Sequence, residues 1–420
     1  MEKITAPRGT KDVLPEESRA WQILEGKLRD LAHRFGFREI RFPTFEDVAL
    51  FDRGVGETTD VVQKEMYDFY DKGDRHIALR PEGTASVVRS FIEHSLHTGT
   101  LPLKVYYIAP NFRYEKPQAG RLREHHQFGI ECFGASDATA DAEVISLAAT
   151  MLRELGISGV ELHLNSCGCR ECRKEYHKEL KAYFETRKSE LCETCNDRLE
   201  RNPMRILDCK SEICKEIAKD APKISDYLCE DCRAHFEKLQ KCLNDMGIAF
   251  TLDPMLVRGL DYYTNTVFEF VSNGIGAQGT VCGGGRYNGL VESLGGVSTP
   301  GLGFGCGIER LMLTLEAEGK LINERLVPDI FIAHADADAE MVAQKLVYEL
   351  RALGVSAERD TTGRSLKAQM KYAGKSGAKF SAVIGGSELE SGKITVKNME
   401  SGETCEAELS AEAISQIFKA

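Results

Sequence analysis

The stretch Asn111–Glu131, which reads NFRYEKPQAGRLREHHQFGIE, decides the fold. Apolar segments at 105–108 and 128–133 lie on either side of its polar, glycine-containing centre. Two strand-like segments joined by a polar turn are typical of an antiparallel β-hairpin. The sequence therefore predicts one long hairpin over 104–131.

This hairpin carries side chains that suit anion binding. Arg113, Arg121 and Arg123 offer planar groups of N–H donors that match phosphate oxygens. Gln127 and Glu131 lie four residues apart on the return strand, so their side chains are expected on one face of the sheet, together with Arg113. Taken alone, an ordinary surface hairpin with charged ends would show the same pattern.

Helix and strand patterns continue on both sides of the hairpin. Apolar residues at helical spacing predict a helix over 21–35, ended by Gly36 and followed by a strand-like run at 37–42. Residues 256–270 return to strand-type residues. The stretch 274–307 holds 13 glycines in 34 residues, which indicates turns or a backbone that a ligand approaches closely.

Beyond residue 325 the pattern changes to that of a small α/β domain with a largely parallel sheet. Strand and helix patterns alternate there, at 329–333, 339–353, 355–359, 364–373, 380–384 and 394–396. We expect one domain over 1–325, interrupted by a cysteine-rich insertion at 165–245, and a second domain over 326–420.

The insertion contains nine of the 14 cysteines, between Cys167 and Cys232. Clustered thiols in a chain without a signal peptide indicate metal binding more than disulfides. The pairs Cys192-x-x-Cys195 and Cys229-x-x-Cys232 suffice for one tetrahedral zinc site. The remaining thiols could furnish another site: Cys167, Cys169, Cys172, Cys209 and Cys214. The spacing leaves open which cysteines group together, and buried thiols without metal are the alternative.

Composition excludes a membrane protein, because 28% of the residues are charged and no apolar run approaches the roughly 20 residues of a spanning helix. Residues 1–15 lack the apolar core of a signal peptide, so we expect a cytoplasmic protein with no membrane partner. The net charge of −11 argues against indiscriminate nucleic-acid binding but leaves local basic surfaces possible. No P-loop pattern GxxxxGK[ST] occurs.

Three blocks resemble the motifs of class II aminoacyl-tRNA synthetases. Residues 112–115 (FRYE), with Arg121 and Arg123 after a loop, resemble motif 2, and 301–313 (GLGFGCGIERLML) resembles motif 3. Residues 35–51 resemble motif 1, which in that class forms a dimer interface. Further blocks resemble the histidyl-tRNA synthetase family: 79–84 (LRPEGT), 256–270 (LVRGLDYYTNTVFEF) and 363–379 (GRSLKAQMKYAGKSGAK).

The resemblance implies an α+β fold: an antiparallel sheet with flanking helices, the cysteine-rich insertion, and a C-terminal α/β anticodon-binding domain. It also implies a homodimer. The implied activity joins histidine to ATP, giving histidyl-adenylate and pyrophosphate, and then transfers the histidyl group to tRNA(His). The alternative is a paralogue of these enzymes that does not aminoacylate and instead regulates ATP phosphoribosyltransferase. That paralogue typically lacks the anticodon domain and the catalytic arginines.

For ATP, the resemblance implies that Arg113 and Arg258 act as catalytic residues at the α-phosphate. Arg121 and Arg310 would bind the γ-phosphate and flank the adenine, with Mg²⁺ bridging phosphate oxygens. His125 stands where the family usually has a phenylalanine that stacks on adenine. Because histidine can carry charge near pH 6–7, ATP affinity is expected to be weaker or pH-sensitive.

For histidine, the resemblance implies that Glu131 and Tyr263 bind the imidazole ring, with Tyr262 beside them and Tyr287 closing the pocket. The residues expected at the α-amino end are Glu82, Thr84 and Gln127. A site that hydrogen-bonds both ring nitrogens rejects analogues, because they leave buried groups unpaired. The alternative for Tyr262 and Tyr263 is that both are ordinary aromatics of a protein core.

Two basic regions are candidate tRNA contacts. Lys116 and Gln118 lie in the motif 2 loop, which in the family approaches the acceptor end. Lys367 and Lys371 repeat at four-residue spacing, so they form one cationic stripe on the helix predicted at 364–373. A solvated helix face would show the same stripe, but a synthetase-like C-terminal domain favours contact with the anticodon stem.

Overall fold

The computed structural model describes residues 3–56, 59–272, 279–322 and 324–418. Its internal contacts divide the chain into two compact units, Met1–Asn323 and Glu324–Ala420. Among the described residues, no helix combines the length and apolar character needed to cross a membrane.

The first unit is built on an eight-stranded sheet in which six central strands run antiparallel to their neighbours and both edge strands pair in parallel. Its order is β1 (Arg38–Glu39), β5 (Leu103–Phe112), β6 (Glu124–Phe133), β11 (Gly301–Gly307), β10 (Thr280–Arg286), β9 (Thr264–Ser272), β7 (Val160–Ser166) and β8 (Thr251–Leu252). The hairpin predicted over 104–131 is confirmed as β5 and β6. In the strand-like run at 37–42, only Arg38–Glu39 forms a strand.

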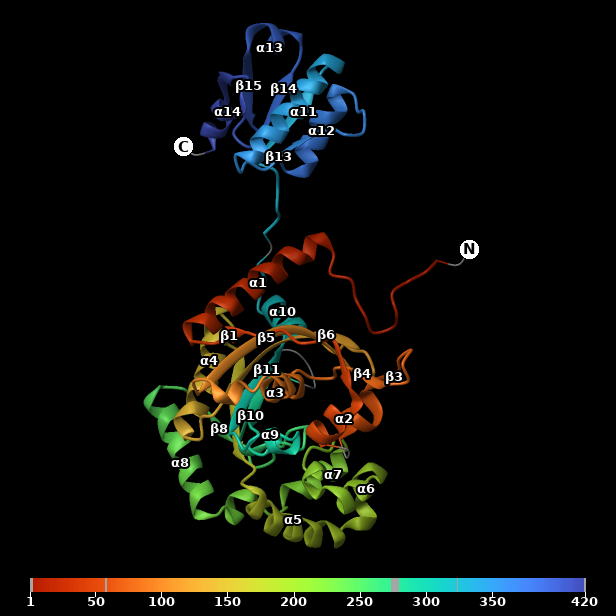
Figure 1. Cartoon of the computed structure of the whole chain (residues 1–420), viewed down its shortest axis with the longest axis vertical. Helices are drawn as coiled ribbons and strands as arrows, with labels where there is room; N and C mark the ends of the chain where they lie inside the picture. Colours follow the sequence, from red (N-terminus) through yellow and green to blue (C-terminus); the bar gives the residue numbers. More distant parts are fainter. Residues whose placement is uncertain (1–2, 57–58, 273–278, 323, 419–420) are drawn as a thin grey trace. The chain divides into compact units, whose positions relative to one another are not determined.

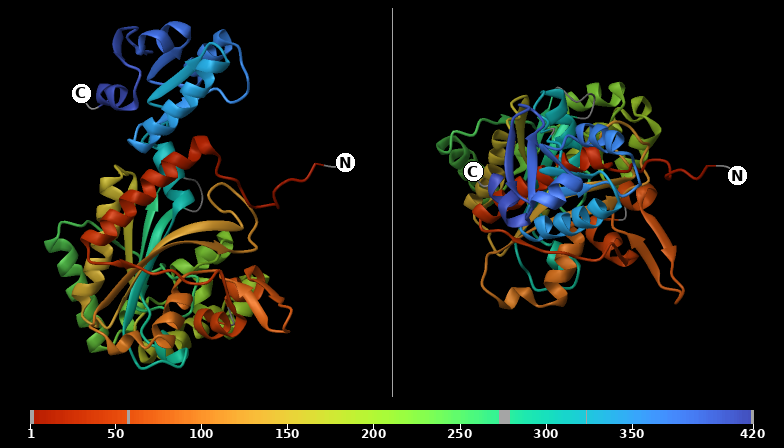
Figure 2. Two further views of the ribbon diagram at one scale, coloured as in Figure 1. Left: turned by 45° about the horizontal axis from the view of Figure 1, so that its top comes forward. Right: turned by 90° about the horizontal axis from the view of Figure 1, so that it is seen from above.

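Helices cover both faces of this sheet (Figure 1; Figure 2). One face packs in a single core with α1 (Pro15–Arg34), α4 (Ala138–Glu154), α8 (Glu230–Asp245) and α10 (Ile308–Ala317). The opposite face packs against α3 (Thr84–Glu93) and α9 (Leu290–Ser293). The helix predicted at 21–35 is confirmed, and it begins earlier because Pro15 stands at its first position, where proline is favoured.

Two smaller substructures complete the first unit. A three-stranded sheet and short helices precede α3: β2 (Phe45–Asp47), β4 (His76–Leu79), β3 (Tyr67–Tyr70), α2 (Val48–Phe51) and two π-turns (Asp52–Gly56 and Val61–Glu65). The insertion has its own small core and contributes α5 (Arg170–Glu185), α6 (Glu193–Arg201), α7 (Glu212–Lys219) and 3₁₀ turns at Lys188–Glu190, Pro203–Ile206 and Ile224–Tyr227. Figure 1 shows α5, α6 and α7 gathered beside the sheet.

The second unit is a five-stranded sheet with helices. Its strands run in the order β13 (Ala357–Arg359), β12 (Ile330–His334), β14 (Phe380–Ile384), β15 (Lys393–Asn398) and β16 (Thr404–Glu408), and its helices are α11 (Ala337–Ala352), α12 (Leu366–Ser376), α13 (Gly386–Ser391) and α14 (Ala411–Ile417). The predicted largely parallel sheet is wrong for the last two strands, which pair antiparallel. The links before β15 and β16 are too short for a parallel crossover.

A buried ion pair joins the sheet to α4 in the first unit. The side chain of Arg286, at the end of β10, is 0% exposed, and that of Asp141 in α4 is 1% exposed. The guanidinium donates to both carboxylate oxygens of Asp141, at 2.5–3.1 Å, and to the carbonyl oxygens of Ala135 and Asp137. Every group of this pair is therefore satisfied, which compensates the cost of removing two charges from water.

We expect Arg286→Met to lower the free energy of unfolding of the protein by about 3–5 kcal/mol, because it leaves the buried Asp141 carboxylate with only the His235 ring, 3.3 Å away, opposite it. Urea denaturation measures the change. The control is Lys181→Met, which removes a solvent-exposed pair with Glu200 and is expected to change the free energy of unfolding far less. Equal effects of the two variants would contradict the assigned role of the buried pair.

Candidate active site

The candidate site lies on the sheet face opposite α1 and α4. Side chains alternate along β6, so Phe128, Ile130 and Cys132 enter the large core, whereas Gln127 and Glu131 point to the other face. The same alternation operates on β9 and places Glu269 between two core phenylalanines, on the site face.

A network of hydrogen bonds surrounds the buried carboxyl group of Glu131. Its two oxygens accept from the Thr84 hydroxyl at 2.8 Å and from the Tyr287 hydroxyl at 2.5 Å. Glu82 lies next to it and accepts from the backbone N–H groups of Thr84 and Ala85 at the start of α3, at 2.8 and 2.7 Å. Two carboxyl groups and two hydroxyl groups thus meet in one buried pocket.

Two tyrosines extend this pocket. The Tyr262 hydroxyl donates to Glu82 at 3.4 Å, and its ring lies 5.8 Å from the Tyr287 ring. The ring of Tyr263 lies 4.7 Å from that of Tyr262. Of the residues expected to bind histidine, the structure therefore brings together Glu82, Thr84, Glu131, Tyr262, Tyr263 and Tyr287.

Glycines of β11 make room for these side chains. A Cβ atom at Gly303 would lie 2.2 Å from a carboxyl oxygen of Glu131, and a Cβ atom at Gly301 would lie 2.2 Å from the Tyr287 ring. Both separations are far shorter than van der Waals contact, so any side chain at either glycine would clash with Glu131 or Tyr287. The glycines predicted to mark a closely approached backbone have this role here, although 274–278 of that stretch lie outside the described residues.

Burial controls the charge of the pocket. Loss of hydration raises the pKa of Glu131 to about 8, although the hydrogen bonds from Tyr287 and Thr84 act in the opposite direction. Burial also raises the pKa of Glu82. Burial therefore favours the protonated form of Glu131 near neutral pH.

Gln127 lies outside this network. Its side-chain oxygen accepts from the Asn111 side-chain amide at 2.6 Å, across the β5–β6 pair. Asn111 is fully buried, and its own side-chain oxygen has no hydrogen-bond partner among the described residues. Sequence reasoning missed Asn111, because a single asparagine before the conspicuous Phe112–Glu115 block gives no separate signal.

Arg258 is held over the same face of the sheet by Glu269. Its guanidinium forms an ion pair with Glu269, whose second oxygen accepts from the Thr280 hydroxyl at 2.7 Å. The guanidinium also lies 5.7 Å from the ring centre of Tyr263. Arg258 therefore borders the carboxyl pocket through Tyr263. Glu269 was not predicted, although its place between two apolar residues of a strand is a signal that could have found it.

Three more arginines lie at the other end of the hairpin. Arg113 donates to the carbonyl oxygen of Pro81 at 2.8 Å, and Arg121 pairs with Glu115 at 2.9 Å. Arg310, in the first turn of α10, donates to the carbonyl oxygen of Thr280 at 2.6 Å. Since the Thr280 hydroxyl donates to Glu269, which pairs with Arg258, Thr280 and Glu269 together link Arg310 to Arg258.

His125 lies among these arginines, and the expectation that it would carry charge near pH 6–7 is wrong. Burial, followed by the positive charges of Arg113, His126, Arg121 and Arg310, lowers the pKa of His125 to about 3. Its imidazole is therefore neutral over the physiological range. A neutral ring can stack on a flat base, so this histidine gives no reason for pH-sensitive ATP binding.

The predicted tRNA-contact residues lie on exposed surfaces. Lys116 and Gln118 are exposed in the loop between β5 and β6, where Gln118 and Arg121 form an isolated bridge. Lys367 and Lys371 are exposed on α12, whereas Leu366 and Met370 of the same helix pack against the core of the second unit.

The cysteines of the insertion form two separate groups of four, and each group could hold a metal ion. Site A consists of Cys169, Cys172, Cys229 and Cys232, and site B of Cys192, Cys195, Cys209 and Cys214. The predicted set that combined Cys192 and Cys195 with Cys229 and Cys232 is therefore wrong. A C-x-x-C spacing brings two thiols together at one helix start, but the packing of the helices decides which pairs meet.

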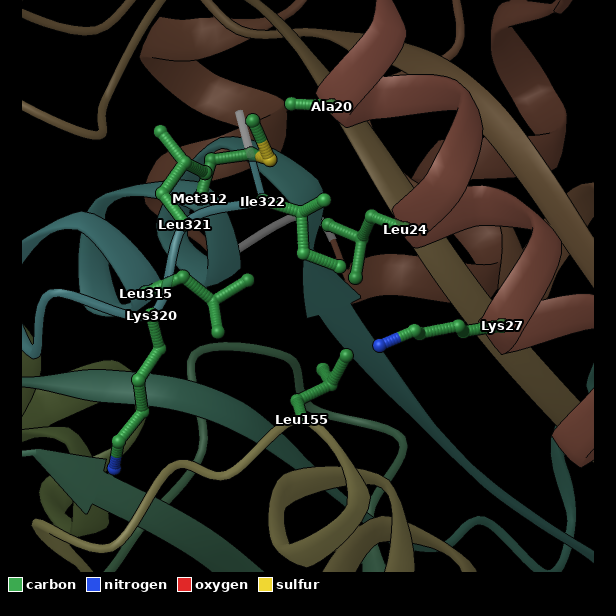
Figure 3. Close-up of a pocket in the computed structure, with 9 residues that line it drawn as sticks. All are labelled: Ala20, Leu24, Lys27, Leu155, Met312, Leu315, Lys320, Leu321 and Ile322. Atoms are coloured by element: carbon green, nitrogen blue, oxygen red, sulfur yellow. The ribbon is translucent and has the colours of Figure 1, made fainter. Parts of the chain in front are cut away.

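An apolar cavity of about 60 Å³ lies elsewhere, near α1 and α10. Figure 3 shows its lining: Ala20, Leu24, Lys27, Leu155, Met312, Leu315, Lys320, Leu321 and Ile322. None of these residues belongs to the carboxyl pocket or to the arginine cluster, and the lining offers no group of polar side chains. This cavity is not the candidate active site.

Comparison with known proteins agrees with this geometry. The family model described as histidyl-tRNA synthetase matches residues 9–311, and the model described as anticodon binding domain matches residues 329–419. The chain is 56% identical to the histidine–tRNA ligase of Caldanaerobacter subterraneus subsp. tengcongensis, over 99% of each chain. It is 55% identical to that of Acetivibrio thermocellus, over 96% of this chain and 97% of the relative.

The crystal structure of apo histidyl-tRNA synthetase from S. aureus is similar throughout. Its TM-score is 0.84, with 43% sequence identity and coverage of 100% of both chains. This agreement confirms the predicted fold class: an antiparallel-rich sheet with flanking helices and a C-terminal anticodon-binding domain. By its sheet, by its motifs and by near-complete coverage at high identity, this chain belongs to the histidyl-tRNA synthetase family of class II aminoacyl-tRNA synthetases.

Proposed function

We propose that the chain is a histidine–tRNA ligase, which activates histidine with ATP and then transfers the histidyl group to the 3′ end of tRNA(His). The observation that carries this proposal is the arrangement of the sheet face. A buried carboxyl pocket centred on Glu131 lies beside Arg258, and Thr280 links the partner of Arg258 to Arg310. In the proposed reaction the carboxylate of the substrate histidine attacks the α-phosphate of ATP. The pocket for histidine and the arginines for the phosphates must therefore lie side by side.

The first step requires two anions to approach each other, so the protein must neutralise charge at phosphorus. Arg113 and Arg258 are assigned to the α-phosphate, where negative charge builds up in the transition state. Arg121 and Arg310 bind the outer phosphates. Mg²⁺ would accompany ATP and supply further neutralising charge, and the carboxylates of Glu115 and Glu269 beside the arginines are the ligand type that this ion takes.

His125 is assigned to the adenine. Its ring lies among the arginines and is neutral, so it can stack on the flat base without adding charge. In this respect a histidine replaces the phenylalanine usual in the family and keeps the same kind of contact.

Histidine itself is assigned to the carboxyl pocket. Glu131 accepts a hydrogen bond from the imidazole ring, and Tyr263 provides the second ring contact. Glu82, Thr84 and Gln127 hold the α-amino end, while Tyr262 and Tyr287 form the wall. An amino acid without a ring donor would lack the hydrogen bond to Glu131, which is how the site would discriminate against it.

For the second step we assign Lys116 and Gln118 to the acceptor end of tRNA(His), and Lys367 and Lys371 to the anticodon stem. Residues 35–51 are assigned to a homodimer interface, by analogy with motif 1. The activity belongs in the cytoplasm, where tRNA is charged for protein synthesis.

The second candidate is the non-aminoacylating paralogue, which would share the sheet, but the ligases that are 55–56% identical over nearly the whole chain favour the ligase. Against the paralogue, Arg113, Arg258 and Arg310 are all present, and the second unit matches the anticodon-binding domain over residues 329–419. The two candidates differ in one measurable property, namely histidine-dependent exchange of pyrophosphate into ATP.

The wild-type protein is expected to catalyse this exchange with histidine and with none of the other 19 amino acids. Arg258→Ala is expected to lower kcat by about 10²–10³-fold, because it removes a preformed positive charge at the reacting phosphate. The control is Arg187→Ala, whose side chain pairs with Glu190 on the insertion surface. A wild-type protein that binds histidine but shows no exchange would support the regulatory candidate.

Glu131→Gln is expected to reduce the pH dependence of stability. In the wild type the folded state holds the Glu131 proton up to about pH 8, whereas the unfolded chain releases it near pH 4.5. The free energy of unfolding therefore falls as the pH rises through this window, and a glutamine, which resembles the protonated carboxyl group, removes that fall. Urea denaturation between pH 5 and pH 8.5 measures the difference, with the exposed Glu161→Gln as control. Parallel pH curves for Glu131→Gln and wild type would contradict the raised pKa.

Replacing both Lys367 and Lys371 by Glu is expected to lower kcat/KM for aminoacylation of tRNA(His) by about tenfold or more, because two phosphate contacts become repulsive. Pyrophosphate exchange is expected to stay unchanged, since it needs no tRNA. The matched control replaces the exposed Lys393 and Lys397 of β15 by Glu. If both double variants lose aminoacylation equally, the α12 stripe has no specific role.

A further inference from the structure

The two cysteine groups of the insertion have the geometry of tetrahedral zinc sites. In site A the sulfurs of Cys169 and Cys172 lie 3.6 Å apart, and in site B those of Cys192 and Cys209 lie 3.8 Å apart. All four sulfurs of each group lie within 4.8 Å of one another. A tetrahedron with zinc–sulfur bonds of about 2.3 Å requires sulfur–sulfur separations of about 3.8 Å.

The backbone around both groups is also arranged for thiolate sulfurs. A cysteine is the N-cap residue of three helices, and the second cysteine of each C-x-x-C pair lies in the first turn: Cys169 caps α5, Cys192 caps α6 and Cys229 caps α8. Free N–H groups and the positive end of a helix stabilise negative charge there.

Backbone N–H groups donate to three of the eight sulfurs. The N–H of Cys229 donates to Cys172 at 3.1 Å, that of Cys192 to Cys214 at 3.3 Å, and that of Ser211 to Cys209 at 3.4 Å. Such bonds are typical of metal thiolates, whose sulfurs carry the negative charge that accepts them.

We propose that the insertion binds two zinc ions, one in site A and one in site B, and that these sites hold the active-site segment 258–265 in place. Each cysteine binds as a thiolate, so its proton passes to solvent when the zinc–sulfur bond forms. The core of the insertion is small and includes most of these thiols themselves. A structural metal ion is one of the usual ways to stabilise such a small core.

Site A contacts the part of the segment that carries Tyr263. Asn265 donates to the sulfur of Cys232 at 3.5 Å, and its backbone N–H donates to the carbonyl oxygen of Gly168 at 2.9 Å. Arg173, next to Cys172, donates to the carbonyl oxygen of Tyr263 at 3.0 Å. Metal in site A therefore fixes one wall of the carboxyl pocket.

Site B contacts the part that carries Arg258. Arg205 lies in the turn Pro203–Ile206, between Cys195 and Cys209, and donates to the carbonyl oxygen of Arg258 at 2.9 Å. Asn202, just before this turn, donates to the carboxylate of Asp261 at 3.0 Å. Metal in site B therefore fixes the backbone under the catalytic arginine, through Arg205 as a positioning residue.

The first test measures the number of metal ions per chain in purified protein by inductively coupled plasma mass spectrometry. We expect two zinc ions per wild-type chain, one in Cys195→Ser, one in Cys232→Ser and none in the double variant. Cys167→Ser and Cys242→Ser are matched controls, because these cysteines lie in or beside the insertion but in neither site, and both should keep two ions.

A wild-type chain that binds no zinc, even when its reduced apo form is titrated with Zn²⁺ alone, would overturn the proposal. So would iron in place of zinc, disulfides in freshly purified protein, or the loss of all zinc in either single variant. The titration uses the wild type, so the outcome does not depend on whether a variant folds.

The second test asks whether the zinc sites hold segment 258–265 in place (the bracing role), and it rests on the proposed ligase function. Cys195→Ser is expected to lower kcat for pyrophosphate exchange by about tenfold or more with little change in KM for histidine, because it displaces Arg258. Arg205→Gln should reproduce that loss while keeping both zinc ions. Cys232→Ser should chiefly raise KM for histidine, and Cys242→Ser should change neither constant.

Equal changes of kcat and KM in the site A and site B variants, or no change in either, would overturn the bracing role. A wild type with two zinc ions but no exchange activity would reject the ligase function instead, and the metal count would stand. The two failures are therefore distinguishable.

Discussion

A strand without side chains on one face is the constraint on which the site depends. At Gly301 and Gly303 the β11 backbone lies directly against the ring of Tyr287 and the carboxyl group of Glu131. This close approach lets a carboxyl group and a large aromatic ring occupy the middle of a sheet whose other face is an ordinary apolar core. Burial then raises the pKa of Glu131, so the same packing that makes room for the carboxyl group also sets its protonation.

Much of the fold could be predicted because local patterns agree with the final structure. The hairpin of β5 and β6 follows from two apolar segments around a polar turn, and α1 follows from its helical spacing of leucines. In the second unit, however, β16, α13 and α14 were not predicted, since short elements give weak periodicity. The antiparallel pairing of β15 could have been read from the short connection between the strands predicted at 380–384 and 394–396, which leaves too little chain for a parallel crossover.

The site was less accessible to sequence reasoning, for a physical reason. Residues in recognisable blocks, such as Arg113, Glu131 and Arg258, could be named in advance. Asn111 and Arg205 instead contact site residues, namely Gln127 and Arg258, that lie elsewhere in the chain. The sequence around Asn111 and Arg205 contains no pattern that predicts these contacts. The cysteine grouping failed in the same way: spacing defines a pair, but the packing of three helices determines which pairs meet. The charge state of His125 likewise depends on its burial in the folded protein, and then on positive neighbours that include Arg310 of α10.

The carboxyl pocket also has a consequence for the order in which the protein is made. Tyr287 and Glu131 are 156 residues apart in the chain, and Tyr262 and Glu82 are 180 apart. While the ribosome is still synthesising the first 280 or so residues, Glu131 has neither the Tyr287 hydroxyl nor the β11 backbone against it and stays hydrated. The pocket is thus completed late in synthesis, when β10 and β11 join the sheet. A ligand that binds only the completed pocket would then stabilise the closed sheet over its open forms.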